Sequence, residues 1–241
     1  MFTSESFRFM VDTFKIIIVK GLPNTLIVLL GTLLISLPLG FLVGLVTFKR
    51  VPVLTQIFKV LISFFRGTPL MILIFLLYSA LPDVINKAVK NAGLTIDVYK
   101  ILVGNTRACA IFICSTFSTA QLSEVFRSAL SSVSPGQLEA CKTIGLNSFQ
   151  SYIHVIIPQA LVSAIPNIGN DVVGLIKGTS LMFYMGLADI MGVAKTEGGF
   201  GYRYVESYFD VLIVFVILCF IVQEFFVWLE KRASVYKKER S

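Results

Sequence analysis

Residues 21–48 read GLPNTLIVLLGTLLISLPLGFLVGLVTF and contain no charged side chain. As a helix this stretch extends roughly 42 Å at 1.5 Å per residue, which exceeds the ~30 Å hydrocarbon core of a bilayer. Its glycines and prolines would weaken a helix in water, whereas small residues let membrane helices approach each other closely. The stretch therefore predicts a membrane-spanning helix and directs the search for others.

The composition of the whole chain of 241 residues points to the same class of protein. Hydrophobic residues make up 56% and charged residues 15%, whereas a soluble domain carries about 25% charged residues. The net charge of +7 includes basic residues that follow the last apolar stretch, at Lys231, Arg232, Lys237, Lys238 and Arg240. Such residues anchor a membrane helix on the cytoplasmic side, so we expect contact with membrane lipid and none with nucleic acid.

Five stretches are long and apolar enough to cross a membrane. We expect an all-α integral membrane protein with a single transmembrane domain over residues 1–241 and spans at about 21–48, 57–81, 108–127, 165–190 and 207–229. The basic tail predicts a cytoplasmic C-terminus, and the odd number of spans then places the N-terminus outside the cytoplasm. We expect residues 83–107 to form a polar loop or surface helix and residues 195–210 to form a glycine-rich connection.

The second span is interrupted by the sequence Arg66-Gly67-Thr68-Pro69. The residue before a proline avoids helical angles, so we expect a kink or local unwinding here, with Arg66 satisfied by protein or water. The alternative is a cytoplasmic helix that ends at this point, followed by a shorter span from Pro69. Farther along, Glu124 and Arg127 are three residues apart and are expected to pair on one helix face.

Motifs for catalysis are absent from the sequence. It contains no G-x-x-x-x-G-K-[ST] phosphate loop, its only histidine is His154, and its four cysteines form no C-x-x-C pair. We therefore expect no catalytic, cofactor or metal site and interpret the cysteines as small apolar residues.

The most informative segment is the polar loop at about residues 135–158. Pro135 suits the first turn of a helix, Gly145 suits the left-handed conformation that ends one, and Asn147 or Ser148 can cap the next. Leu138, Cys141 and Ile144 recur at helical spacing and are expected to share one face. Two short helices that meet at a bend are thus predicted, forming either a docking knob or an ordinary amphipathic connector.

This loop resembles the EAA loop of ATP-binding cassette (ABC) importer permeases. In that family, E-A-A is followed after three residues by glycine and after nine more by I-x-L-P. Cys141 replaces the usual alanine, and further similarities and departures run along most of the chain. The matching positions are Glu139, Ala140, Cys141, Gly145, Val155, Ile157 and Pro158 in the loop, and Thr25-Leu26, Arg66–Pro69, Glu124–Arg127, Pro158–Ala160, Pro166, Asn170 and Lys177–Leu181 elsewhere, with Gly178 and Asp189 as departures.

The similarity is strongest to the polar amino-acid uptake branch, and it implies a type I permease fold. It further implies an identical or related second permease chain, two separate ATPase subunits that contact the EAA loops, and an extracytoplasmic solute-binding protein. The resemblance also implies that ATP binding closes the pair of ATPase subunits and that this closure tilts the membrane spans. The amino acid, polar or cystine-like, stays open.

Polar groups within spans are functional candidates because lipid does not solvate them. We expect the solute pathway to include Glu124, Asn170, Asp171, Lys177, Thr179 and Ser180. The alternative is that these groups pair with one another to hold the helices together. Two other functions remain open from the residues: an ion-gradient-driven secondary transporter of amino acids, and a membrane scaffold that transports nothing.

Overall fold

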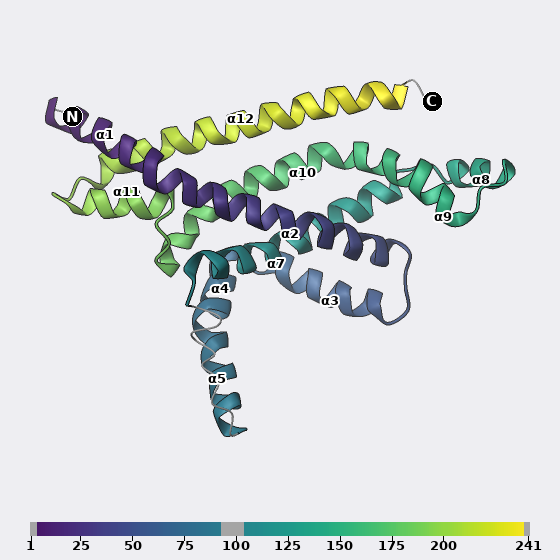
Figure 1. Cartoon of the computed structure of the whole chain (residues 1–241), viewed down its shortest axis with the longest axis horizontal. Helices are drawn as coiled ribbons and strands as arrows, with labels where there is room; N and C mark the ends of the chain where they lie inside the picture. The colour runs from purple at the N-terminus through teal and green to yellow at the C-terminus, as the bar shows by residue number, and fades with distance from the viewer. Residues whose placement is uncertain (1–3, 93–103, 239–241) are drawn as a thin grey trace. The chain divides into compact units, whose positions relative to one another are not determined.

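The computed structural model describes residues 4–92 and 104–238, with side chains up to residue 234 (Figure 1). Residues 93–103 of the expected polar loop and Arg240 of the basic tail lie outside the described residues. Within the described part every regular element is a helix, and short π or 3-10 turns (η) interrupt several of them. The elements are α1 (Ser4–Ile16), η1 (Ile17–Gly21), α2 (Leu22–Phe48), α3 (Leu54–Gly67), α4 (Leu70–Ile74), η2 (Phe75–Ala80), α5 (Leu81–Asn91), α7 (Thr106–Ser131), α8 (Pro135–Thr143), α9 (Ser148–Ser151), η3 (Tyr152–Ile156), α10 (Ile157–Thr179), η4 (Ser180–Met185), α11 (Ile190–Gly199) and α12 (Tyr204–Lys238).

Five continuous helical stretches are long and apolar enough to span a membrane, which agrees with the expected all-α membrane fold. They are Ser4–Phe48, Leu70–Asn91, Thr106–Ser131, Ser148–Met185 and Tyr204–Ser234. Most are longer than the expected spans because polar turns continue the helix beyond the apolar run. Helix α10 already begins at Ile157, before the expected start of the fourth span at about residue 165, and it contains Pro166.

The interruption expected after Arg66 is present. Helix α3 ends at Gly67 and α4 begins at Leu70. Between them Pro69 has a ψ angle of 138°, which is extended rather than helical. The break separates α3 from the Leu70–Asn91 stretch, and only the latter is long enough to be a candidate span.

Contacts divide the described chain into two compact units, and the long helices contribute to both. The first unit takes residues up to 34, 67–117 and 174–219. In this unit α11 packs on η1, and a Cβ added at Gly21 would lie 2.9 Å from Ile190 Cα. The Ile190 amide also donates to Thr25 Oγ1 (3.2 Å), and Asn24 Nδ2 donates to the Ala188 carbonyl (2.7 Å). Small and polar residues of the first apolar stretch thus fix α11 in place.

The second unit takes residues 35–66, 118–173 and 220 onward. Here α2 and α7 approach closely, because a Cβ at Gly40 would lie 2.8 Å from Leu122 Cβ and one at Gly44 would lie 2.7 Å from the Ser123 carbonyl oxygen. Ser118 donates a hydrogen bond to Ser36 across the same seam (3.1 Å). Small residues therefore serve helix packing, as expected for a membrane bundle.

Candidate functional site

The bend expected in the polar loop is formed between α8 and α9, and it is built around Gly145. Gly145 has a φ angle of +83°, in the left-handed region that favours glycine. Its amide donates to the Lys142 carbonyl (3.0 Å), and the Leu146 amide donates to the Cys141 carbonyl (3.0 Å). These two bonds form a Schellman motif, which satisfies the last carbonyls of α8 and turns the chain sharply.

The second arm of the bend starts at a capping box. The Asn147 side chain accepts from the Gln150 amide (2.8 Å), while the Gln150 side chain accepts from the Asn147 amide (3.0 Å). Of the two residues expected to cap this helix, Asn147 does so and Ser148 is the first helical residue. Local hydrogen bonds therefore fix the backbone on both sides of the bend.

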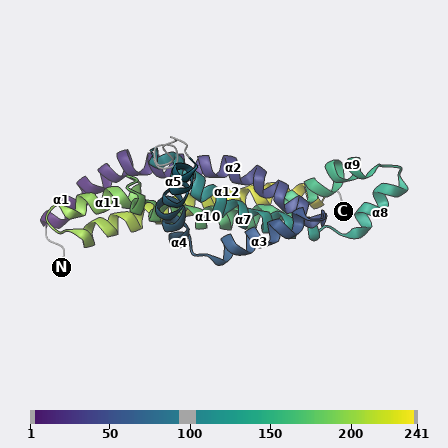
Figure 2. The same cartoon turned by 90° about the horizontal axis from the view of Figure 1, so that it is seen from below.

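Figure 2 shows the path of α8 and α9. The side chains of this loop separate into an anchored set and an exposed set. Cys141 is buried, and Leu138 and Ile157 pack against the core of the second unit. Glu139 and Ala140 are exposed. The expected shared face is therefore correct for Leu138 and Cys141, whose side chains hold α8 against the core.

Ile144 does not belong to that face. It follows the last residue of α8, so the helical spacing no longer applies to it, and its side chain is 75% exposed. Phe149, on the other side of Gly145, is 74% exposed. Two large apolar side chains thus flank the bend and are mostly exposed.

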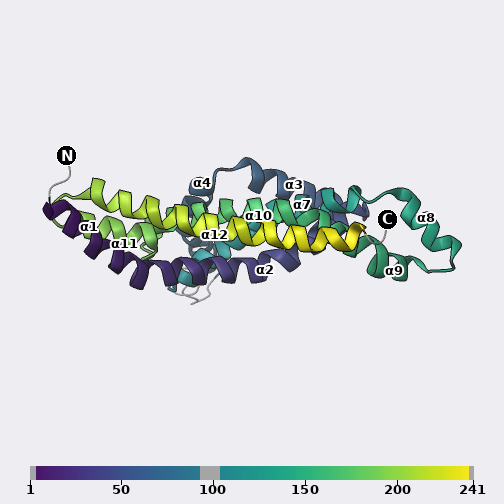
Figure 3. The ribbon, with the colours of Figure 1, turned by 90° about the horizontal axis from the view of Figure 1, so that it is seen from above.

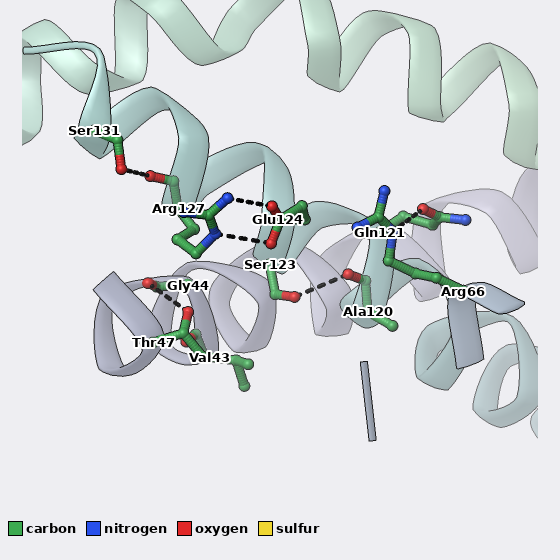
Figure 4. Close-up of polar contacts among 10 residues, drawn as sticks. All are labelled: Val43, Gly44, Thr47, Arg66, Ala120, Gln121, Ser123, Glu124, Arg127 and Ser131. Carbon is green, nitrogen blue, oxygen red and sulfur yellow. Dashed lines mark hydrogen bonds and ion pairs between the residues drawn. The ribbon is translucent and has the colours of Figure 1, made fainter. Parts of the chain in front are cut away.

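The expected pair on α7 is present. Arg127 donates to both carboxylate oxygens of Glu124, with Nε to Oε2 at 2.9 Å and a second bond from Nη2 to Oε1 (Figure 4). On α3, Arg66 Nε donates to Gln121 Oε1 (3.1 Å). The Glu124 carboxylate, which the sequence placed in the solute pathway, is therefore already paired within its own helix.

Three of the expected pathway residues lie on α10 without such partners. Asn170 and Lys177 are exposed and seven residues apart, so they lie on one side of this helix. Beside them, Asp171 has one carboxylate oxygen, Oδ2, that is buried and lacks a hydrogen-bond partner within residues 4–92 and 104–238.

The remaining two expected residues bond to their own backbone. Thr179 Oγ1 donates to the Ile176 carbonyl (2.7 Å), and Ser180 Oγ donates to the Lys177 carbonyl (2.6 Å). Thr179 is also fully buried. Both hydroxyls stabilise the change from α10 to the 3-10 turn η4, and neither is presented as a free donor.

Sequence reasoning missed Gln121 as a functional candidate. It is an uncharged polar residue in a helix rich in serine and threonine, so nothing in the sequence distinguished it. The signal that was available was Arg66, a charge that needs a partner in an apolar region. Among the described residues no cluster of three His, Cys, Asp or Glu side chains is suited to hold a metal ion.

The described residues thus form a helical membrane domain with a capped bend in its polar loop. Residues 36–235 match the family of binding-protein-dependent transport system inner membrane components. The match covers most of the chain, which belongs to this family. It is accordingly a multi-pass inner-membrane permease component, and this family does not itself hydrolyse ATP.

Individual relatives carry more specific names. The chain is 37% identical over 89% of its length to the probable amino-acid permease protein YxeN of Bacillus subtilis, covering 89% of that protein. It is 33% identical over 92% of its length to the L-cystine transport system permease protein TcyL of the same organism, covering 90%. The structure of an amino acid ABC transporter with histidines aligns with a TM-score of 0.76 at 23% identity, covering 92% of this chain and 96% of that one. This last likeness supports the fold.

Proposed function

We propose that this chain is the permease subunit of an ABC importer for polar amino acids. The observation that carries the proposal is the bend at Gly145. Its sequence has the spacing of the EAA loop, and it leaves two large apolar side chains exposed. Relatives named as amino-acid and L-cystine permeases support the substrate class. The individual amino acid is not specified by these similarities, and cystine is one member of the proposed class.

The bend would transmit the movement of an ATPase subunit to the spans. Ile144 and Phe149 supply the apolar contacts, and Glu139 and Ala140 lie exposed on α8. Behind them, the segment that contains Val155, Ile157 and Pro158 continues directly into α10. A push on the bend therefore acts on the base of a membrane helix with no flexible linker between them.

The membrane topology follows from this assignment. If the bend faces the cytoplasm, the odd number of spans places the C-terminus there and the N-terminus outside. A second permease chain, identical or related, would complete the pathway. Lipid does not solvate Asn170 or Lys177, so a second chain or an aqueous path has to cover this side of α10.

The solute pathway is proposed to run along α10. An amino acid carries an ammonium and a carboxylate, and the incompletely bonded Asp171 and the exposed Lys177 offer the complementary charges. Asn170 adds an amide that both donates and accepts. Glu124, Thr179 and Ser180 line this path in supporting roles, because their polar atoms are already bonded within their own helices.

Reconstitution in proteoliposomes tests the proposal. Uptake of labelled amino acids should require the partner ATPase, ATP and the binding protein, and a cysteine at Ala140 should crosslink to the ATPase. Uptake that persists without ATPase and collapses with an ionophore would establish a secondary transporter instead. A complex with no amino-acid-stimulated ATP hydrolysis and no uptake would leave the scaffold alternative.

A further inference from the structure

The first unit contains a helical module that continues beyond the hydrocarbon core. Helix α1 and η1 carry Glu5, Arg8, Asp12, Lys15 and Lys20, and the charge-free run begins only at residue 21. From Ser4 to Lys20 the helical rise amounts to roughly 25 Å. The polar headgroup layer is only ~5–8 Å thick on each side, so most of this segment lies in water.

Two further helices complete the module. Helix α11 runs beside α1, and the first turns of α12 lie next to both (Figures 1 and 3). Their shared core contains Ile17, Ile190, Val193, Ala194 and Val211. The three segments therefore form one packed projection rather than the loose glycine-rich connection expected at residues 195–210.

Long-range contacts fix the turn between α11 and α12 at the tip of this projection. Arg203 donates to the Glu5 carbonyl (3.3 Å) and carboxylate (3.4 Å), and its guanidinium lies 5.4 Å from the centre of the Phe9 ring. At the start of the turn, a Cβ at Gly198 would lie 2.8 Å from Ser207 Oγ. Both sides of the turn are thus tied to neighbouring helices.

The turn presents two aromatic side chains to solvent. Phe200 is 69% exposed and Tyr202 is 88% exposed. Tyr202 also adopts a φ angle of +57°, which is unfavourable for a residue with a bulky side chain, although its ring gains no packing in return. A strained backbone that displays an unpacked ring points to a role in function rather than in folding.

We propose that this aromatic turn, Phe200–Tyr202, is a docking point for the extracytoplasmic solute-binding protein. The inference rests on the proposed function, because the single span Ser148–Met185 separates the turn from the cytoplasmic bend and so places the two on opposite sides of the membrane. A binding protein is the partner on which the family's transport depends. Its matching surface would be an apolar socket that receives the two rings, since buried aromatic anchors dominate protein interfaces.

Lipid is the rival occupant, and the position of the turn argues against it. Arg203 ties the turn to Glu5, whereas the charge-free run of the first stretch begins only at residue 21. The helix from residue 5 to residue 21 therefore raises the turn by about 24 Å above that run. This is higher than the interfacial layer in which aromatic belts lie.

The test measures ATP hydrolysis by the complete transporter in proteoliposomes against the concentration of amino-acid-loaded binding protein. The variant F200A/Y202G removes both rings, and glycine suits the left-handed backbone at residue 202, so folding is preserved. The half-saturating concentration of binding protein should rise about tenfold or more, with the maximal rate unchanged. Tyr202→Phe should remain within about twofold of the native protein, because the ring is retained.

Phe220→Ala is the matched control, because this phenylalanine is 64% exposed but lies in the charge-free run of α12. In this variant the half-saturating concentration of binding protein should be unchanged. An unaltered value for F200A/Y202G, with native stimulation intact, would overturn the docking inference and leave the proposed function standing. Absence of any binding-protein stimulation in the native complex would instead overturn both, as would labelling of a Tyr202→Cys variant only from the cytoplasmic side.

Discussion

The bend at Gly145 and the turn at Phe200–Tyr202 are both proposed to contact a partner protein, and different interactions hold them in place. Each has a left-handed residue, and each leaves two large apolar side chains exposed. The bend at Gly145 is fixed by hydrogen bonds within ten residues, whereas Arg203 ties its turn to Glu5, 198 residues away. A turn that is fixed by neighbouring residues can be recognised in a sequence. A turn that is fixed by distant residues cannot be distinguished there from an irregular loop.

The largest expected effect is that of Gly145→Val. Nothing lies within 4 Å of the Cβ position, so the substitution acts only through the φ angle of +83°. A β-branched residue is strained there by about 1–3 kcal/mol. The bend should open, and ATP-driven uptake in proteoliposomes should fall about tenfold or more while the permease still inserts in the membrane.

Gly145→Asn is the control for that variant, because asparagine tolerates the left-handed region better than other residues. It should retain most of the uptake. Equal loss in both variants would mean that position 145 matters for contact with the partner rather than for backbone conformation, and full activity in both would remove the bend from the mechanism.

The exposed apolar pair of the same bend gives the next largest effect. Ile144→Ser and Phe149→Ser remove contacts that only a partner can bury, and each loss at an interface anchor costs about 1 kcal/mol or more. Together they should weaken binding of the ATPase subunit about tenfold or more, measured by titration of the purified permease. Ser148→Ala, an exposed position between them that is not the cap, should bind normally.

The outcome of the sequence analysis follows this division between local and tertiary signals. The number of candidate spans, the break at Pro69, the Glu124–Arg127 pair and the capped bend were predictable because each depends on residues within a few turns. The second candidate span, Leu70–Asn91, starts later than the expected 57–81. Helix α11 was not predicted, because its sequence is short and glycine-rich and its stability comes from packing on Gly21 and Thr25. Ile144 was misplaced because helical spacing was extended one residue past the end of α8.

The pathway residues show the same limit. All six residues, Glu124, Asn170, Asp171, Lys177, Thr179 and Ser180, were candidates from the sequence because they are polar within apolar segments. The structure distinguishes Glu124, Thr179 and Ser180, which have local partners, from the others. Hydrogen bonding to one's own helix depends on rotamers that a sequence pattern does not specify.

An intermediate effect is expected for the pH dependence of stability, and it comes from Asp189. This residue lies at the base of the projecting module and outside the candidate spans. Its Oδ1 accepts from the Gly192 amide (2.8 Å), and burial raises the pKa of its carboxyl to about 7. The folded protein therefore favours the protonated form, so stability should fall as the pH rises from about 4 to about 7 and change little above that. At about 1.4 kcal/mol per pH unit, the fall over these three pH units is roughly 4 kcal/mol.

Asp189→Asn should remove that pH dependence, because the amide oxygen keeps the cap without a charge. Thermal unfolding in detergent at pH 5 and pH 8 measures it, with Asp12→Asn on exposed α1 as a control that leaves the profile unchanged. A pH profile that is identical in Asp189→Asn and the native protein would show that this carboxyl does not titrate differently on folding.

A smaller effect separates stability from docking at the aromatic turn. Tyr202→Gly relieves the strained φ angle of +57° and should raise the free energy of unfolding by about 0.5–1 kcal/mol. The same substitution at Val205, which is exposed in α12, should instead lower it by about 0.5–1 kcal/mol, because glycine weakens a helix. If Tyr202→Gly destabilises the protein, the ring has a packing role and the functional reading of the strain is wrong.

The smallest effect concerns the ion pair that ties the turn to α1. The side chains of Arg203 and Glu5 are 35% and 81% exposed, so solvent screens their interaction. A double-mutant cycle with Arg203→Gln and Glu5→Gln should give a coupling energy of about 0.2–1 kcal/mol. Arg203→Gln alone should cost more than Glu5→Gln, since it also loses the contact with Phe9 and the bond to the Glu5 carbonyl. Equal single effects would mean that charge alone holds the turn, and the tertiary packing would then contribute nothing at its tip.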